Sequence, residues 1–198
     1  MSSAESFETN GYVQVKEFLD AQTMPVVSQY LENRIRRGEW VSGCEGPSSQ
    51  TKMFCYADPL IEALLLAYKD TVEQIVGKEL EPTYSYTRIY QPGEELLPHT
   101  DRPACEISVT VNVAHKGPAS PIYMQYKDKT TGAYALNAGD AVIYKGCEVT
   151  HWRTPLTEEQ LNVQFMLHYV DKNGPNMSHA KDKRPAYGFR SNEKLGGA

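Results

Sequence analysis

The sequence lacks any long apolar run. No stretch of its 198 residues approaches the roughly 20 consecutive apolar residues that a membrane-spanning helix requires, so we expect no membrane segment. The first residues, Met1–Ser6, also lack the basic and then apolar order of a secretory signal. These two absences favour a cytoplasmic protein.

Positive charge is also scarce. Lys and Arg number 20 against 25 Asp and Glu, which gives a net charge of −5 and a pI near 5.6. A general nucleic-acid binder needs clustered basic residues for phosphate contacts, so we expect no nucleic-acid partner. Hydrophobic residues make up 40% and charged residues 23%, which excludes a disordered or fibrous class. We found no internal repeat, and the length suits a single domain over residues 1–198.

Cysteine is sparse and unpatterned. The four cysteines stand at positions 44, 55, 105 and 147, and no two of them form a Cys-x-x-Cys pair. This spacing is unlike a disulfide scaffold or a zinc module. We therefore expect four reduced thiols that are partly buried.

Two segments of the first 80 residues have helical periodicity. One runs from about Ala21 to Arg37, and the other begins with Asp58 as N-cap and Pro59 at the first helical position. The second helix is predicted to end at Gly77. Between them, Ser42–Thr51 is rich in Gly, Ser and Pro and is predicted to be a loop. We expect residues of about 20–80 to form a helical support packed on a sheet.

Short strands replace helices after Pro82. The predicted strands are Thr83–Gln91, Glu106–Val113, Ile122–Tyr126, Ala141–Tyr144, Val149–Arg153 and Leu161–Tyr169. Many short strands behind a helical layer indicate an α+β fold that is mainly β, with a sandwich or jelly-roll core over about residues 82–170. The polar tail 171–198 is predicted to be an extended wrap or partly mobile.

Three residues form the strongest candidate site. His99 and Asp101 are two positions apart, so strand periodicity places them on one face at a strand end, with Thr100 facing away. His151 lies 50 positions beyond Asp101, in another predicted strand that follows a turn at Gly146. Two imidazoles and one carboxylate are the ligand set of non-haem Fe(II) oxygenases, which leaves three metal positions open. These three side chains are therefore the candidate ligands of an iron site.

Further residues stand in a fixed order around these ligands: Tyr90, Pro92-Gly93, His99, Asp101, the run Ala138–Tyr144, His151 and Pro155. With this order the chain resembles the 2-oxoglutarate/Fe(II) dioxygenases, and most closely their prolyl-4-hydroxylase-like branch. The opening segment Phe7–Leu19 also looks like the amino-terminal strand of that superfamily. The resemblance extends from about Phe7 to Asp171. It implies a double-stranded β-helix, jelly-roll or cupin-like, buttressed by the amino-terminal helices.

The resemblance also implies cofactors. Fe(II) would bind 2-oxoglutarate and O2, and the reaction would release succinate and CO2 while a C–H bond of the substrate is hydroxylated. Ascorbate is a further reductant that the resemblance allows. The iron performs this chemistry, whereas the protein supplies positioning and protection. A free thiol close to such an iron is open to oxidation, or to occupying one of its open positions.

The outer C5 carboxylate of 2-oxoglutarate needs a cation or a strong hydrogen-bond set. In prolyl hydroxylases a Tyr about nine residues before the first His ligand contributes, and Tyr90 stands there. The family places an Arg or Lys nine to eleven residues after the second His, where this chain has only Gln160, Leu161 and Asn162. We therefore predict Arg153, which shares the strand face of His151, as the anchor. Arg88 is the alternative.

Other side chains complete the predicted cavity. Asn162 and Gln164 alternate with apolar residues on their strand, so we expect them to line the cavity and to supplement the anchor. Tyr86 and Arg88 share a face with Tyr90 and are candidates for substrate contact or an alternative anchor. Both arginines are also open to a purely structural role, in ion pairs that include Glu106.

Two more basic side chains flank this set. Arg102 follows Asp101 directly, and it is predicted either to orient that ligand, to meet an acidic substrate group or to form a surface ion pair. His115 lies beside Lys116-Gly117-Pro118 and is expected in a loop.

The leading functional prediction is a hydroxylase of a peptidyl substrate, with proline first among the targets. Resemblance alone supports that substrate, because a fold does not fix what an enzyme acts on. A hydroxylase of a free amino acid or another small molecule is the main alternative. The second alternative is a non-catalytic metal-binding β-barrel module, which the departure at Gln160–Asn162 keeps open. Partners are thus a peptide, a protein or an amino acid, and the chain is predicted to be a monomer or a homodimer.

Overall fold

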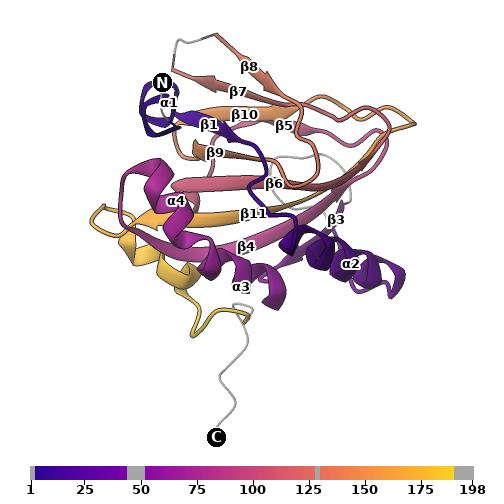
Figure 1. Ribbon diagram of the computed structural model, residues 1–198, viewed down its shortest axis with the longest axis horizontal. Helices are drawn as coiled ribbons and strands as arrows, with labels where there is room; N and C mark the ends of the chain where they lie inside the picture. The colour runs from indigo at the N-terminus through magenta and orange to yellow at the C-terminus, as the bar shows by residue number, and fades with distance from the viewer. Residues whose placement is uncertain (1–2, 44–51, 128–129, 190–198) are drawn as a thin grey trace, which may run out of the picture.

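Two antiparallel sheets face each other in the computed structural model, which describes residues 3–43, 52–127 and 130–189 (Figure 1). The larger sheet has the strand order β1-β9-β6-β11-β4-β3-β2, and the smaller one has the order β5-β10-β7-β8. The larger sheet consists of β1 (Tyr12–Val15), β2 (Val41–Gly43), β3 (Lys52–Tyr56), β4 (Leu80–Tyr90), β6 (Ile107–Lys116), β9 (Ala141–Lys145) and β11 (Leu161–Asp171). The smaller sheet consists of β5 (Leu96–His99), β7 (Ile122–Tyr126), β8 (Gly132–Tyr134) and β10 (Val149–Arg153).

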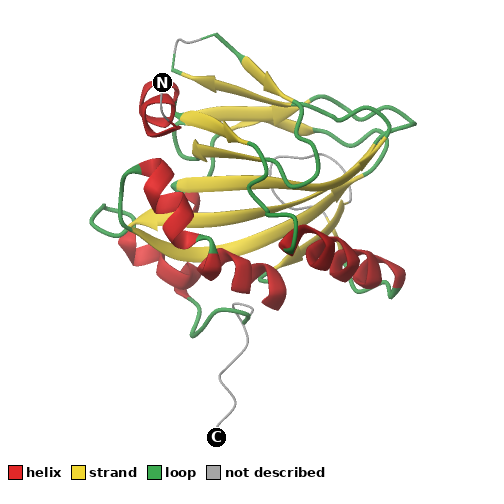
Figure 2. Ribbon diagram, in the orientation of Figure 1, coloured by secondary structure: helices red, strands yellow, loops and turns green. Residues whose placement is uncertain are grey.

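Helices cover the outer face of the larger sheet (Figure 2). They are α2 (Thr23–Arg36), α3 (Pro59–Ala67) and α4 (Lys69–Val76), and α1 (Ser3–Asn10) precedes β1. Leu65 of α3 and Phe165 of β11 are fully buried in the core between helices and sheet. Full burial of a side chain of this size contributes about 1.5–3 kcal/mol. The predicted arrangement, a mainly β core supported by amino-terminal helices, is confirmed.

In β11 the sequence pattern determines which side chains face the helical core and which face the space between the sheets. Val163, Phe165 and Leu167 belong to the core under the helices. Gln164 and His168 point the other way, into the space between the two sheets, and line a cavity there. The period-2 alternation therefore gives this strand one apolar face and one polar face, and both faces are buried.

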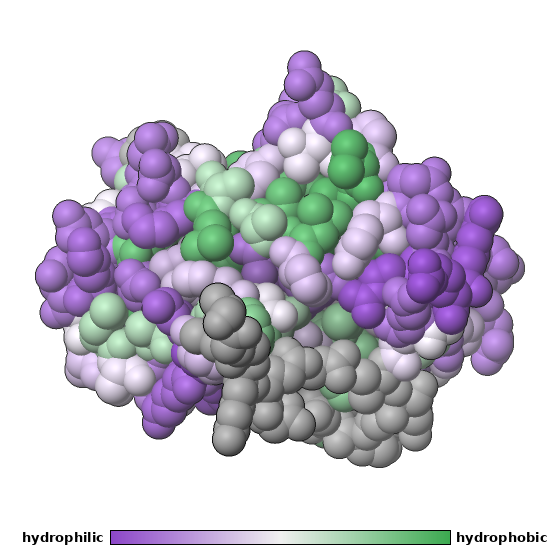
Figure 3. Space-filling model, turned by 90° about the horizontal axis from the view of Figure 1, so that it is seen from below, coloured by the Kyte–Doolittle hydropathy of each residue, from purple (hydrophilic) through white to green (hydrophobic). Residues whose placement is uncertain are grey.

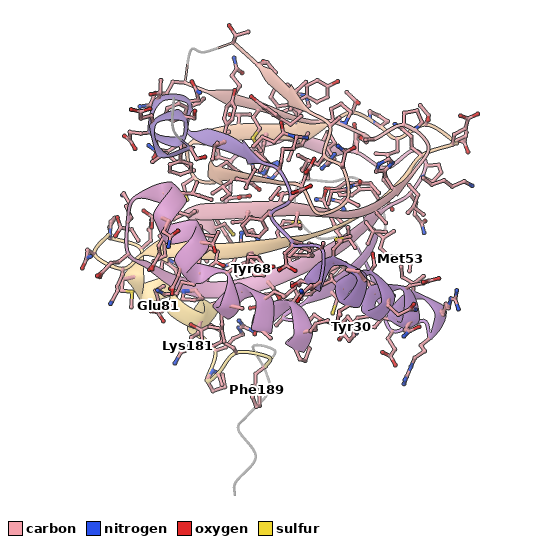
Figure 4. The ribbon with its side chains drawn as sticks, viewed as in Figure 1. Tyr30, Met53, Tyr68, Glu81, Lys181 and Phe189 are labelled. Carbon is pink, nitrogen blue, oxygen red and sulfur yellow. The ribbon has the colours of Figure 1, made fainter. Side chains whose placement is uncertain are left out.

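Three boundary predictions need correction. The helix expected from Asp58 to Gly77 is broken at Tyr68, whose ring packs on Phe18 and whose hydroxyl donates to Asp20 (Figure 4). Asp58 does cap α3, because its carboxylate accepts from the first two free N–H groups. The expected amino-terminal strand at 7–19 begins only after Gly11, since residues 3–10 form α1.

The predicted loop at Ser42–Thr51 is also partly wrong. Residues 41–43 form β2, which pairs with the unpredicted strand β3. The remainder, residues 44–51, lies outside the described residues.

The described part of the tail, residues 172–189, folds back against β4 and α3. After β11 it forms the 3-10 segment η2 (Met177–Lys183), and Lys181 and Phe189 mark its course in Figure 4. The buried guanidinium of Arg184 then donates to Glu62 of α3 at 2.6 Å and to the backbone oxygen of Thr83 at 2.8 Å. Glu62 also accepts from the backbone N–H of Gly188. The ion pair between Arg184 and Glu62 thus holds the tail against the helical layer, and no short-range sequence pattern predicts it.

Replacing Glu62 with alanine is expected to lower the free energy of unfolding by about 3–5 kcal/mol, because it leaves the Arg184 charge buried without a partner. Urea denaturation measures this loss, and limited proteolysis should cut the segment after β11 earlier. Glu79→Ala is the matched control, since its pair with Lys172 is largely exposed and is worth about 1 kcal/mol or less. Equal stability of the two variants would contradict the proposed anchoring.

Among the helices of the described ranges, none is long and apolar enough to cross a bilayer. Figure 3 views the molecule from the helical side, where apolar residues lie among a larger hydrophilic surface. The exposed large hydrophobic side chains of the described chain lie on four elements, α2, α3, β5 and η2: Val26, Ile35, Leu66, Leu97 and Met177.

Candidate metal centre

The three predicted ligands meet at one edge of the smaller sheet. His99 ends β5 and His151 lies in β10, and the two residues are direct partners across these antiparallel strands. Their ring centroids are 4.2 Å apart. One carboxylate oxygen of Asp101, Oδ1, lies 3.5 Å from Nε2 of each histidine. Three donor atoms from distant positions in the sequence thus converge within 4.8 Å of one another.

Backbone carbonyls orient both imidazoles. Nδ1 of His99 lies 2.8 Å from the oxygen of Leu97, and Nδ1 of His151 lies 3.1 Å from the oxygen of Val149. A carbonyl oxygen only accepts, so each Nδ1 carries the proton and each Nε2 presents its lone pair toward Asp101. Orientation of a ligand imidazole through its other nitrogen is typical of metal sites. The donor set fits one Fe(II) held by two Nε2 atoms and Oδ1.

Asp101 is placed by a loop rather than by strand alternation. β5 ends at His99, and the N–H of Asp101 donates to the oxygen of Gly146 at 2.8 Å. A Cβ on Gly146 would lie 2.7 Å from Oδ2 of Asp101 and 2.1 Å from the oxygen of Cys105, so only glycine fits here. Beyond the strand the alternation stops, and Thr100, which was predicted to face away, is among the residues that line the cavity.

The pKa values of Asp101 and His151 are shifted in the directions that favour metal binding. Burial by itself would raise the pKa of Asp101, but the neighbouring side chains of His99 and His151 lower it below its ordinary value. Burial lowers the pKa of His151, although Asp101 opposes the shift. A deprotonated carboxylate and a neutral imidazole are the forms that bind metal.

A cavity of about 800 Å³ opens beside the three ligands. Five of the residues predicted for cosubstrate or substrate line it: Tyr86, Arg88, Tyr90, Arg102 and Gln164. Two others, Arg153 and Asn162, are buried just behind this wall, where each donates to Oε1 of Gln164. The predicted polar face of β11 therefore reaches the cavity through Gln164.

The two candidate anchors have different surroundings. Arg153 is 2% exposed, and it donates to the oxygen of Ser120 at 2.5 Å and to Gln164 at 2.8 Å. Among the described residues, no carboxylate lies within 4.0 Å of its guanidinium, so the expected pair with Glu106 is not formed. Burial lowers the pKa of Arg153, as expected for a cation far from water.

Arg88 differs because acidic and backbone groups surround it. Its guanidinium lies 3.8 Å from the carboxylate of Glu94 and donates to the oxygen of Glu95 at 3.2 Å. It also stacks on Tyr90, 3.7 Å from the ring centroid, while Arg153 lies 5.6 Å from the same ring. Tyr90 thus lies between the two arginines, and only Arg88 has an acidic neighbour at ion-pair distance within the described part of the chain.

Arg102 forms an ion pair with the tail. Its two terminal nitrogens donate to Asp182 at 2.7 and 2.9 Å, and its guanidinium lies 4.5 Å from the ring centroid of Tyr84. Tyr56 also donates to Asp182, at 2.5 Å. The carboxylate is carried by a run of three non-glycine residues with positive φ, 181–183. Of the three roles predicted for Arg102, the ion pair is the one that the structure contains.

Sequence analysis missed the second layer behind Asp101. Ser108 of β6 donates to its Oδ2 at 2.9 Å and lies 3.0 Å from Nδ1 of His168 on β11. Strand alternation places both side chains on the cavity side, so this signal was available. Asp182 had no such signal, because its partner is 80 positions away in an irregular segment. His115, expected in a loop, lies near the end of β6 and pairs with Asn162.

Acid is expected to destabilise the metal-free protein through His168. Burial lowers the pKa of this side chain to about 4 from an ordinary 6.5. The unfolded chain therefore takes up a proton below pH 6.5 that the folded chain refuses until about pH 4. The free energy of unfolding should fall by about 3 kcal/mol across this window. Urea titrations of EDTA-treated protein measure the fall, and His168→Gln should flatten it; an unchanged slope would contradict the assignment.

Comparisons with known proteins identify the fold. No protein family model and no curated relative matches the sequence, but solved structures do. A Pseudomonas putida prolyl-4-hydroxylase matches with a TM-score of 0.69 and 16% identity, over 85% of this chain and 97% of that chain. A Trichoplax adhaerens prolyl hydroxylase, in complex with a hypoxia inducible factor peptide fragment, matches with a TM-score of 0.68 and 12% identity, over 86% and 88%.

A third structure carries a different kind of ligand. The epimerase SnoN, in complex with Fe³⁺, alpha ketoglutarate and nogalamycin RO, matches with a TM-score of 0.71 and 15% identity, over 98% of this chain and 94% of that chain. At such low identities these matches establish the architecture rather than the substrate. The chain has the double-stranded β-helix fold of the 2-oxoglutarate/Fe(II) oxygenases.

Proposed function

We propose that this chain is an Fe(II)- and 2-oxoglutarate-dependent dioxygenase. The observation that carries the proposal is the convergence of two oriented imidazoles and one buried carboxylate on a cavity of about 800 Å³. When bound, the iron would supply oxygen activation coupled to the decarboxylation of 2-oxoglutarate to succinate and CO2. The fold is one in which enzymes of this class are found. The protein would hold the metal, the cosubstrate and the substrate in place and would exclude water from the cavity.

His99, Asp101 and His151 would hold the metal through the atoms that already face one another. Arg153 would hold the C5 carboxylate of 2-oxoglutarate, because a buried guanidinium with no carboxylate close by in the described chain gains most from an anion. Gln164 lies between this cation and the cavity and would turn its amide toward the same carboxylate, assisted by Asn162.

Tyr90 would form one wall of the cosubstrate pocket. It is 1% exposed and lines the cavity between the two candidate cations. Thr110 of β6 and Tyr144 of β9, whose hydroxyls lie 3.4 Å apart, also line the cavity and offer two further hydrogen-bonding groups. Burial and the nearby Asp101 raise the pKa of Tyr144 well above its usual value, so its phenol keeps its proton.

For the substrate we propose a peptide, with proline as the residue that is hydroxylated. The cavity has the aromatic side chains Tyr56, Tyr84 and Tyr86 along one wall, which suit the apolar body and ring of proline. Two of the solved structures with the same fold are prolyl hydroxylases, and one of these has a peptide bound.

A free amino acid is the second candidate, and one observation favours it. Arg102 and Asp182 both line the cavity as an ion pair, so a zwitterion entering between them would meet one charge for its carboxylate and one for its ammonium group. Peptides that are blocked at both ends lack these charges. The two candidates therefore differ in whether terminal charges on the substrate matter.

Succinate release in the presence of Fe(II), 2-oxoglutarate and O2 separates these readings. We expect proline-containing peptides to stimulate succinate formation with one hydroxyl gained per succinate, whether or not their ends are blocked. Coupled turnover on free amino acids alone would replace the peptide by the second candidate. Calorimetry with Mn(II) in the absence of oxygen tests the enzyme class itself. Failure of 2-oxoglutarate to bind at millimolar concentration would leave a non-catalytic metal-binding module.

A further inference from the structure

A thiol and a phenol touch each other beside the metal ligands. Sγ of Cys105 lies 3.0 Å from the hydroxyl of Tyr84, and both side chains are buried and line the cavity. Ligand atoms of Cys105, His168 and Asp101 also lie within 4.8 Å of one another, so the sulfur is next to the carboxylate that would hold iron. Cys105 has no role in the proposed hydroxylation, and Tyr84 serves there only as part of a cavity wall.

The pair is not arranged as a second metal site. Burial, reinforced by the charge of Asp101, raises the pKa of the Cys105 thiol far above its usual range. Burial also raises the pKa of Tyr84. A metal binds the thiolate, whereas here sulfur and oxygen both keep their hydrogen at neutral pH. A neutral thiol and a neutral phenol are instead good donors of hydrogen atoms, which suits them to oxidation.

We propose that Cys105 and Tyr84 are a site of self-modification, at which the chain forms a thioether between Sγ and the Tyr84 ring carbon next to its hydroxyl. This inference rests on the proposed function, because the oxidant is O2 activated with 2-oxoglutarate in the absence of an organic substrate. The Cys105 thiol lines the cavity in which the oxidant would arise, so its S–H hydrogen is within reach of that oxidant.

The reaction balances with the proposed cosubstrates alone. The S–H bond of Cys105 and one ring C–H bond of Tyr84 break, and one S–C bond forms. O2 takes up four electrons, two from the decarboxylation of 2-oxoglutarate and two from the Cys–Tyr pair. The products are the thioether, succinate, CO2 and one water, which carries both hydrogens. The protein therefore loses two hydrogen atoms and gains no oxygen.

The link would fix the loop that carries a metal ligand. Cys105 lies in the 3-10 turn η1 (Pro103–Cys105), which follows Asp101, and Tyr84 lies in β4 of the larger sheet. The ring of Tyr84 also packs on the His168 imidazole, with centroids 4.5 Å apart, and under the guanidinium of Arg102. A covalent bond here would join Asp101, through its loop, to the central strands.

The test uses the full chain, reduced and freed of metal, then incubated in air with Fe(II) and 2-oxoglutarate but no other substrate. Peptide mapping by mass spectrometry should find the Tyr84 and Cys105 peptides joined, lighter by two hydrogens and resistant to dithiothreitol. Thiols counted after denaturation should fall from four toward three. The linked fraction should grow with the succinate released in the same samples. Samples without oxygen should show no change.

Variants locate the link. Tyr84→Phe and Cys105→Ser should each abolish the joined peptide, whereas Cys147→Ser should retain it, because that half-buried thiol contacts only the backbone oxygen of Arg102 among its hydrogen-bond partners in the described chain. If a variant folds poorly, the peptide map of the protein without substitutions still shows whether the link between Cys105 and Tyr84 forms.

Two failures are distinguishable in this experiment. Succinate release without joined peptides, or with an added oxygen on Cys105 or Tyr84 instead, overturns the cross-link and leaves the dioxygenase standing. Absence of both succinate and 2-oxoglutarate binding overturns the proposed function, and the cross-link falls with it.

Discussion

Replacing His99 with alanine is expected to abolish succinate formation and to weaken Mn(II) binding by about 100-fold or more. Changes in the groups that merely orient a metal ligand already cost about 10–100-fold in affinity, so removal of a ligand should cost at least the upper end of that range. His99 supplies one of three donors, and its loss leaves two of the triad, Asp101 and His151. Calorimetry without oxygen measures the affinity, and succinate release measures the turnover.

His115→Ala is the matched control for this experiment. Both histidines lie at or near strand ends, and each has Nδ1 close to a backbone carbonyl oxygen two residues away, at 2.8 Å for His99 and 3.0 Å for His115. His115 lies outside the cavity, so metal affinity should be unchanged. Equal loss in both variants, or no loss in His99→Ala, would remove His99 from the metal centre. Thermal unfolding of the metal-free variants reports any separate effect on folding.

The parts of the fold that sequence could predict are those governed by a short period. β11 illustrates this, because its apolar and polar residues alternate so regularly that Phe165 and Gln164 could be assigned to opposite faces before the structure was available. The same argument placed Tyr86, Arg88 and Tyr90 on the cavity side of β4. Period-2 alternation is informative here because the two faces are buried against different surroundings, helices on one side and a polar cavity on the other.

The errors occur where the chain leaves regular structure. Asp101 is positioned by the hydrogen bond of its N–H to Gly146 and not by strand alternation, because β5 ends at His99. Asp182 reaches the cavity through a contact with a residue 80 positions earlier, and Arg184 reaches Glu62 over 122 positions. No local pattern encodes such pairs, because each depends on how the whole tail packs. The ligand triad itself was predictable only through its residue types and order.

Arg153 offers the sharpest test of how the cosubstrate is held. Arg153→Met removes the charge but keeps a long apolar side chain in a site that is 2% exposed. Truncating one partner of a buried charge pair costs about 2–5 kcal/mol, so affinity for 2-oxoglutarate should fall by a factor on the order of 10²–10³. Stability of the protein without ligands should change by no more than about 2 kcal/mol, because relief of a buried charge offsets the hydrogen bonds to Ser120 and Gln164.

Arg88→Met is the variant to compare, because it removes an equally buried guanidinium that touches the same tyrosine. It leaves the Glu94 carboxylate buried without its neighbouring cation, so it should lower stability more than Arg153→Met does, while 2-oxoglutarate affinity falls less than tenfold. Calorimetry on the Mn(II) form measures affinity, and urea denaturation without metal measures stability. The reverse pattern would make Arg88 the anchor. If Arg153→Met instead loses much stability but binds 2-oxoglutarate normally, then Arg153 stabilises the fold and does not bind the cosubstrate.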